Sequence, residues 1–167
     1  MIGIGELKRI LPHRYPMLLV DRIVALEPGR RVTALKAVTV NEPWYRALPD
    51  DARDEDHDYP PVLLVESWCQ AAAVLASGDR ADPGGLPLVA QVTGVGFGAP
   101  VRPGDVLEHR ARVVQLQSDA LVVAGWSRVG DEVVLTVSTA IVVRRPVDAL
   151  EPGSRPTRIE NTVASSH

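Results

Sequence analysis

The stretch that most constrains the fold runs from Tyr59 to Gly78, YPPVLLVESWCQAAAVLASG. The double proline at its start can open a helix but not continue one, because proline lacks a backbone N–H, and Gly78 suits the position just after a helix. Between them lie about 16 residues, which would span roughly 24 Å of helix. They leave no broad polar face, and their one carboxylate is Glu66. Such a helix is buried on most sides and too short to cross a bilayer, so the rest of the chain must wrap it.

Composition places the chain among globular proteins with one domain. It has 167 residues, of which 46% are hydrophobic, and a net charge of −3, which gives no broad basic surface for nucleic acid. Cys69 is the single cysteine, which excludes an intrachain disulfide and an all-cysteine metal site. The N-terminus has no apolar run of signal-peptide length, so we expect a cytoplasmic protein. We predict one domain over residues 1–145 and a flexible tail over 146–167, which is rich in Pro, Ser and Thr.

Hydrophobic periodicity predicts strands on both sides of the central helix. The expected elements are a short helix at 3–10, strands at 17–26 and 31–40, an acidic loop at 44–58, the central helix, and strands at 86–97, 105–117, 119–128 and 131–144. This order predicts an α+β hot-dog fold, in which a curled antiparallel sheet wraps round one long central helix. The sheet would keep an open edge, which a second subunit usually covers.

Four motifs in a fixed order carry a family resemblance. They are LPHRYPMLLVDR at 11–22, VNEP at 40–43, YPPVLLVESWCQ at 59–70 and FGAPVRPGDVL at 97–107. Over residues 6–145 the chain resembles the bacterial 3-hydroxyacyl-[acyl-carrier-protein] dehydratases of the FabA/FabZ type, and is closer to FabZ. The resemblance implies a hot-dog dimer that acts on acyl thioesters carried on the phosphopantetheine of an acyl carrier protein. It implies no metal and no other cofactor.

Dehydration of a 3-hydroxyacyl thioester needs a base for the α-proton, an acid for the departing hydroxyl and a donor for the thioester carbonyl. The resemblance makes Glu66 the acid and Gln70, one helical turn later, its polar partner. A carboxyl group on so apolar a helix should be desolvated and hold its proton to higher pH, which suits an acid. The resemblance extends the substrate-binding set to Leu48, Pro61, Val62, Trp68 and Phe97.

Two catalytic parts of the family are replaced in this chain. Counted from VNEP, the family's histidine falls on Leu48, and leucine cannot move a proton. The family's glycine before the helix, whose backbone N–H meets the thioester carbonyl, falls on Pro61, which has no N–H. His57, in the same acidic loop, is the alternative base. We expect His13 to cap a turn, His109 to lie on an exposed strand and Cys69 to pack in the core.

The surroundings of the site also depart from the family. Its basic residues near the tunnel mouth are Gly98 and Ala99 here, and the 50–58 segment is acidic, which would repel an acidic carrier protein. Four hypotheses follow. In the first, the chain is a dehydratase subunit of fatty-acid or reducing polyketide synthesis, and a paralogous partner in a heterodimer supplies the histidine. In the second, the chain is an active homodimeric dehydratase that uses His57. Alternatively it is a thioesterase that uses Glu66, or a non-catalytic acyl-binding or stabilising pseudoenzyme.

Overall fold

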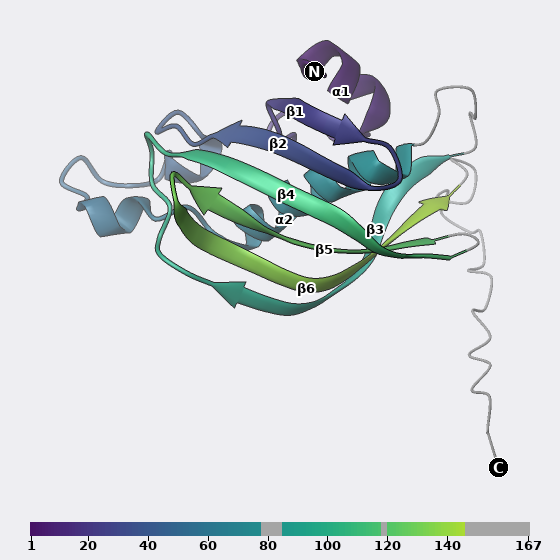
Figure 1. The fold of residues 1–167 in the computed structure, drawn as a ribbon. Helices are drawn as coiled ribbons and strands as arrows, with labels where there is room; N and C mark the ends of the chain where they lie inside the picture. Colours follow the sequence, from purple (N-terminus) through teal and green to yellow (C-terminus); the bar gives the residue numbers. More distant parts are fainter. Residues whose placement is uncertain (78–84, 118–119, 146–167) are drawn as a thin grey trace, which may run out of the picture.

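A computed structural model of the protein describes residues 1–77, 85–117 and 120–145. Its elements are, in order, α1 (Ile4–Ile10), β1 (Arg22–Glu27), β2 (Arg31–Ala37), the 3₁₀ turns η1 (Pro43–Tyr45) and η2 (Asp54–His57), α2 (Pro61–Ala73), the 3₁₀ turn η3 (Val74–Ser77), β3 (Leu86–Phe97), β4 (Val106–Leu116), β5 (Ala120–Val129) and β6 (Glu132–Arg145). Figure 1 shows them along the chain.

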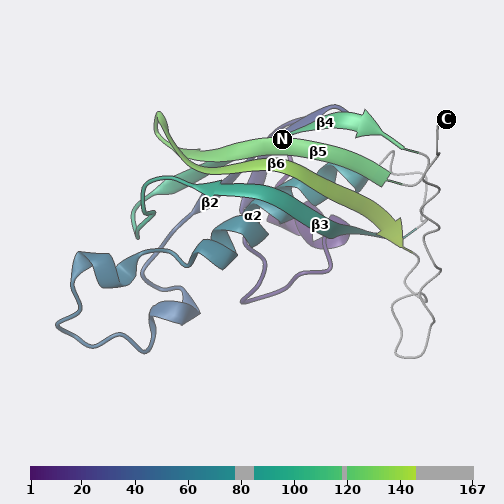
Figure 2. The ribbon, with the colours of Figure 1, turned by 90° about the horizontal axis from the view of Figure 1, so that it is seen from below.

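The strands form one antiparallel sheet of six, in the order β1-β2-β4-β5-β6-β3. The sheet curves over α2, which lies along its inner face in both views (Figures 1 and 2). The predicted α+β hot-dog fold is therefore confirmed. Residues on β2 alternate, with Val32 and Ala34 buried toward the helix and Arg31 exposed on the outer face, as a sheet with one covered face requires.

Helix α2 begins where the two prolines place it. Pro60 is the N-cap residue and Pro61 the first helical residue, and the N–H groups of Leu63 and Leu64 bond the Pro60 carbonyl. Val62 remains 74% exposed, whereas the helix from Ser67 onward is buried. The first turn is thus the most accessible part of α2 in this chain.

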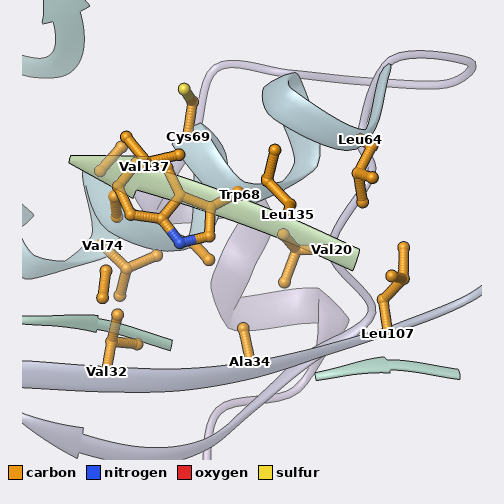
Figure 3. Close-up of a cluster of buried hydrophobic side chains, with 14 of the residues drawn as sticks. Val20, Val32, Ala34, Leu64, Trp68, Cys69, Val74, Leu107, Leu135 and Val137 are labelled. Carbon is orange, nitrogen blue, oxygen red and sulfur yellow. The ribbon is translucent and has the colours of Figure 1, made fainter. Parts of the chain in front are cut away.

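The core lies between α2 and the inner face of the sheet. Trp68 is fully buried, and Figure 3 shows it among side chains from both layers. The labelled members of this cluster are Val20, Val32, Ala34, Leu64, Trp68, Cys69, Val74, Leu107, Leu135 and Val137. Alanines at the end of α2 allow the helix and strands to approach closely. Burial of this apolar surface, at about 25 cal/mol per Å², explains why a nearly all-apolar helix forms here.

The predicted strand boundaries differ from the structure mainly at the N-terminal hairpin. The first strand begins at Arg22 and not at Met17, and the second ends at Ala37. The segment before Arg22 is held by the Gln70 side chain, which bonds the Met17 carbonyl and the Leu19 N–H in place of a neighbouring strand. The four later strands lie within one or two residues of their predicted ends. Gly78 and the 146–167 tail lie outside the described residues.

Strand β3 is an edge of the sheet. It pairs with β6, and it is the last strand in the sheet order. The second half of β3 is exposed, including Val95 at 37% and Phe97 at 55%. An edge of this length with exposed apolar side chains is a surface that proteins usually cover. Within the described ranges, we find no helix with the length and apolar character needed to cross a membrane.

Candidate active site

Glu66 lies on α2 at the boundary between the buried helix and solvent. Its side chain is 34% exposed. Its Oε1 accepts a hydrogen bond from Gln70 Nε2 at 2.8 Å and lies 3.2 Å from His13 Nε2. The predicted proximity of Glu66 and Gln70, one turn apart on the same helix face, is confirmed. The carboxylate is therefore held by one residue of its own helix and one residue of the N-terminal loop.

The expected upward shift of the Glu66 pKa is wrong for this structure. Partial burial acts to raise the pKa of Glu66, but the contacts with His13 and Gln70 outweigh burial and hold the pKa below its ordinary value. The apolar helix around the carboxyl group, taken alone, favours a raised pKa of Glu66. The two polar partners reverse the sign of this shift, so the carboxyl group of this chain by itself is ionised at neutral pH.

Gln70 is buried and its amide is fully engaged. Besides its bond to Glu66, Nε2 donates to the Met17 carbonyl at 2.7 Å, and Oε1 accepts from the Leu19 N–H at 2.9 Å. The amide therefore connects the 17–19 segment to α2, and both of its N–H donors are used within the chain. Its position is structural and orienting, and it fixes the carboxylate it touches.

His13 was predicted to cap a turn, and the structure instead directs its ring at Glu66. Its neighbour Arg14 fixes the loop by donating to the carbonyl groups of Lys8 and Leu11, each at 2.9 Å. The other ring nitrogen, His13 Nδ1, is buried without a hydrogen-bond partner within the described residues. Sequence reasoning missed this contact, although the LPHRYP motif marked the residue.

The loop between β2 and α2 carries Leu48, at the position expected for the family's histidine, and His57, the predicted alternative base. Leu48 packs partly buried against the core, and its N–H bonds the Tyr45 carbonyl. His57 Nδ1 lies 3.0 Å from the Arg53 carbonyl oxygen, and its ring is 5.9 Å from that of Tyr45. Both contacts of His57 lie within the loop, and the described residues show no ion pair between His57 and Glu66. The structure thus does not bring this alternative base to the carboxylate.

The remaining predicted site residues divide into two groups. Pro61, Val62 and Phe97 are exposed, at the start of α2 and the end of β3. Trp68 instead lies in the core, with no exposed surface, and its Nε1 donates to the Arg110 carbonyl at 3.0 Å. In this chain Trp68 joins the helix to the sheet and is not placed to touch a substrate. Cys69 is buried, which raises its thiol pKa to about 12, so it packs as predicted.

A buried polar network lies directly behind the site, and the sequence prediction for it is wrong. His109 has no exposed surface, whereas an exposed position was expected from its neighbours Glu108 and Arg110. Its Nε2 lies 2.8 Å from Ser67 Oγ and its Nδ1 lies 2.7 Å from Ser127 Oγ. Ser67 Oγ in turn donates to the Leu19 carbonyl at 2.7 Å.

The hydrogen bonds of this network fix the state of the ring. Because the Ser67 proton goes to the Leu19 carbonyl, His109 Nε2 must donate to Ser67 and Nδ1 must accept from Ser127. Complete burial, with a smaller effect from Lys36, lowers the His109 pKa to about 3, so the ring is neutral. Strand alternation was the available signal, because Leu107, His109 and Ala111 share the inner face of β4.

A family model described as a FabA-like domain matches residues 11–138. The chain is 36% identical over 141 residues to the 3-hydroxyacyl-[acyl-carrier-protein] dehydratase FabZ of Campylobacter fetus, an alignment that covers 80% of this chain and 92% of that protein. It is 39% identical over 154 residues to the FabZ of Myxococcus xanthus, with 90% and 97% covered.

A solved structure shares the fold. "The Dehydratase Heterocomplex ApeI:P from Xenorhabdus doucetiae" matches with a TM-score of 0.69 and 17% identity, over 85% of this chain and 92% of that one. No group of three or more His, Cys, Asp or Glu side chains in the described part of our chain is arranged to hold a metal ion.

Proposed function

The chain belongs to the FabA-like family, and from this premise we propose that it is a FabZ-like 3-hydroxyacyl-[acyl-carrier-protein] dehydratase subunit that needs a partner subunit to complete its site. The relatives named as FabZ support the substrate class, an acyl thioester on the phosphopantetheine arm of a carrier protein. The single observation that carries the proposal is the carboxylate of Glu66, which His13 and Gln70 hold in place, while the position at which the family's histidine is expected is Leu48. Fatty-acid and reducing polyketide synthesis are the pathways that use such a step.

The proposed roles of the two subunits follow from proton balance. A partner histidine takes the α-proton of the substrate, the C–O bond at the 3-position breaks, and Glu66 gives its proton to the leaving hydroxyl, which departs as water. The proton on the histidine then returns to Glu66 for the next turnover. In this scheme His13 and Gln70 are positioning residues, which contact Glu66 Oε1 and orient the carboxyl group.

Assembly would also correct the charge state of Glu66. In the single chain, one third of its side chain faces solvent, and its pKa is held low by His13 and Gln70. Burial acts to raise the pKa of Glu66. A second subunit that covers the exposed part of the side chain would increase this burial, and the pKa would rise from its lowered value. A carboxyl group that becomes an effective acid only in the assembled dimer fits a site shared between two chains.

The exposed edge of β3 is the surface that we propose for this partner. Phe97 and Val95 on β3 and Val62 on α2 are exposed apolar residues of the single chain. A second hot-dog subunit that pairs with β3 would cover the edge and could approach the start of α2. The structural neighbour described as a dehydratase heterocomplex is a precedent for two different chains in such an assembly.

The test compares the chain alone with the chain co-expressed with hot-dog paralogues encoded near it. Native mass spectrometry gives the oligomer, and a 3-hydroxyacyl carrier-protein assay gives turnover. We expect no turnover from the chain alone and turnover from the heterodimer. Glu66→Gln in the heterodimer should reduce turnover by about 100-fold or more, as removal of a general acid does, whereas Glu132→Gln, a matched change on exposed β6, should leave it unchanged.

Two results would contradict the proposal. Turnover by the chain alone at the rate of the heterodimer would show that no partner residue is needed, and a further loss on His57→Ala would then identify the base. Release of free thiol without formation of the unsaturated product would instead show hydrolysis of the thioester.

A further inference from the structure

The outer face of the sheet, away from α2, carries a groove that the proposed function does not use. Two adjoining hollows, of about 450 and 630 Å³, share Glu27, Arg31 and Arg112. The lining of the first hollow combines small residues, among them Ala25, Ala124 and Gly125, with arginines. We call this feature the arginine groove, and it spans β1, β2, β4 and β5. Helix α2, which carries the candidate active site, lies along the inner face of the sheet (Figures 1 and 2). Arg31, Arg110 and Arg112 are exposed and alternate with buried residues on β2 and β4, so the groove lies on the opposite face.

Two like charges face each other at the centre of the groove. Arg31 on β2 and Arg112 on β4 are direct cross-strand partners, an arrangement that destabilises a sheet unless an anion compensates it. Glu27 pairs with Arg31, because Arg31 Nε donates a hydrogen bond to its carboxylate at 2.7 Å. The same carboxylate lies 3.8 Å from Arg30. No carboxylate of the described residues pairs with Arg112, although it is exposed and directly opposite another cation.

The second row of the groove holds further cations in fixed positions. The guanidinium groups of Arg110 and Arg128 lie 5.1 and 5.4 Å from the ring centroid of Trp126. Both also contact Glu108, at 2.8 and 3.1 Å. The indole and the carboxylate thus restrict these side chains before any ligand binds, which lowers the entropic cost of binding.

The groove is positive in a chain that is negative overall. Its arginines at 30, 31, 110, 112 and 128 face two glutamates, at 27 and 108, an excess of three positive charges in a chain of net charge −3. Folding has therefore gathered cations from three separate strands and one turn on a single face. Such gathering against the sign of the whole chain points to an anionic ligand.

We propose that the arginine groove binds a small soluble ligand through a diphosphate or phosphate-ester group. Planar guanidinium groups match phosphate oxygens in bidentate geometry. Arg112, which pairs with no carboxylate of the described residues, and Arg31 directly opposite it place two guanidinium groups at one point. The hollows have the volume of small-molecule sites. The hollows are concave, and Trp126, the aromatic residue in their lining, is covered by Arg110 and Arg128. A surface that inserts into a bilayer would instead project exposed aromatic or aliphatic side chains.

The test is calorimetric titration of the full chain with inorganic pyrophosphate at low and at physiological ionic strength. We expect saturable binding that Arg112→Gln and Arg31→Gln each weaken by about tenfold, the value of one lost charge-assisted hydrogen bond. Arg9→Gln makes the same charge change on exposed α1 and should alter the affinity by less than about twofold. Circular dichroism of each variant checks that the fold is retained.

Three results would overturn the proposal. The first is the absence of saturable pyrophosphate binding. The second is equal weakening of binding by Arg9→Gln, which would show non-specific electrostatic attraction. The third is binding to phosphatidylglycerol vesicles without binding to pyrophosphate, which would show a membrane contact. The proposal stands apart from the dehydratase function, because Glu66→Gln should leave pyrophosphate binding unchanged even if that function fails.

Discussion

His13 Nε2 lies 3.2 Å from Glu66 Oε1, so a residue of the N-terminal loop contacts the carboxylate of the central helix. The contact joins segments that are far apart in the sequence. It also acts against burial, because a nearby proton donor stabilises the ionised carboxyl group. The charge state of Glu66 is thus set by the loop that precedes β1 as much as by the apolar helix that carries it.

Replacement of His13 should raise the pKa of Glu66. In His13→Gln the amide keeps a neutral polar group in the loop, and burial is opposed mainly by Gln70. We expect the carboxyl ¹³C signal of Glu66 to titrate at a higher pH in the variant than in the wild type. Lys8→Gln, an exposed change in α1, is the control and should not move this titration. An unchanged pKa in His13→Gln would mean that the contact does not determine the charge state.

Buried His109 should make stability fall in mild acid. Its folded pKa of about 3 lies below its ordinary value of 6.5, so between these values the unfolded chain binds the proton more readily. Stability from this group is therefore fully present above pH 6.5 and decreases as pH falls toward 3, by at most about 1.4 kcal/mol per pH unit.

The matched comparison uses His109→Leu and His57→Ala in urea unfolding from pH 7.5 to 4.5. At pH 7.5, His109→Leu should cost about 1–3 kcal/mol, because Ser127 loses its hydrogen-bond acceptor. The variant should also show a shallower decline toward acid than the wild type. His57→Ala, a change in the loop, should keep the wild-type slope. Parallel curves for His109→Leu and the wild type would contradict the assigned neutral state.

Local signals predicted most of the fold. The prolines and the apolar run defined α2, and alternation located the strands, because both depend on neighbouring residues. The start of β1 could not be read in this way. It depends on Gln70, which holds Leu19 from 51 positions away in the sequence. The apolar residues 17–20 match a strand pattern, but the Gln70 side chain hydrogen-bonds the Met17 carbonyl and the Leu19 N–H.

In the candidate site, too, local contacts could be predicted from the sequence and tertiary contacts could not. Glu66 and Gln70 are one helical turn apart, so their contact followed from helix geometry. The approach of His13 is a tertiary contact, which periodicity cannot show. The alternation in β4 indicates that His109 is buried, whereas the charged residues on either side of it favour an exposed position.

Gly125 should tolerate no side chain. A Cβ there would lie 2.0 Å from the Arg110 carbonyl oxygen, which also accepts the hydrogen bond from Trp68 Nε1. Gly125→Ala therefore forces β4 and β5 apart, and we expect a loss of about 2–4 kcal/mol in urea unfolding. Gly5→Ala, in α1 with open space around it, should be neutral or stabilise by up to about 1 kcal/mol. Equal effects of the two changes would contradict the close approach of the strands.

The proposed replacements at Leu48 and Pro61 make a final prediction about the chain on its own. Leu48→His supplies a base in the loop, and Pro61→Gly restores a backbone N–H at the start of α2, where the helix dipole favours negative charge on a thioester oxygen. Loss of one such donor costs about 100- to 1,000-fold in rate. We therefore expect the double variant to dehydrate a 3-hydroxyacyl carrier protein, and Leu48→His alone to be at least about 100-fold slower.

Adding Glu66→Gln to the double variant is the control, and it should abolish the new activity, because the acid is then absent. Leu48→His alone as active as the double variant would show that Pro61 does not limit catalysis. A folded double variant without activity would show that the loop does not carry position 48 to the carboxylate, and that a base must enter from outside the chain. Because Leu48 packs partly buried on the core, urea unfolding of each variant has to accompany the assay.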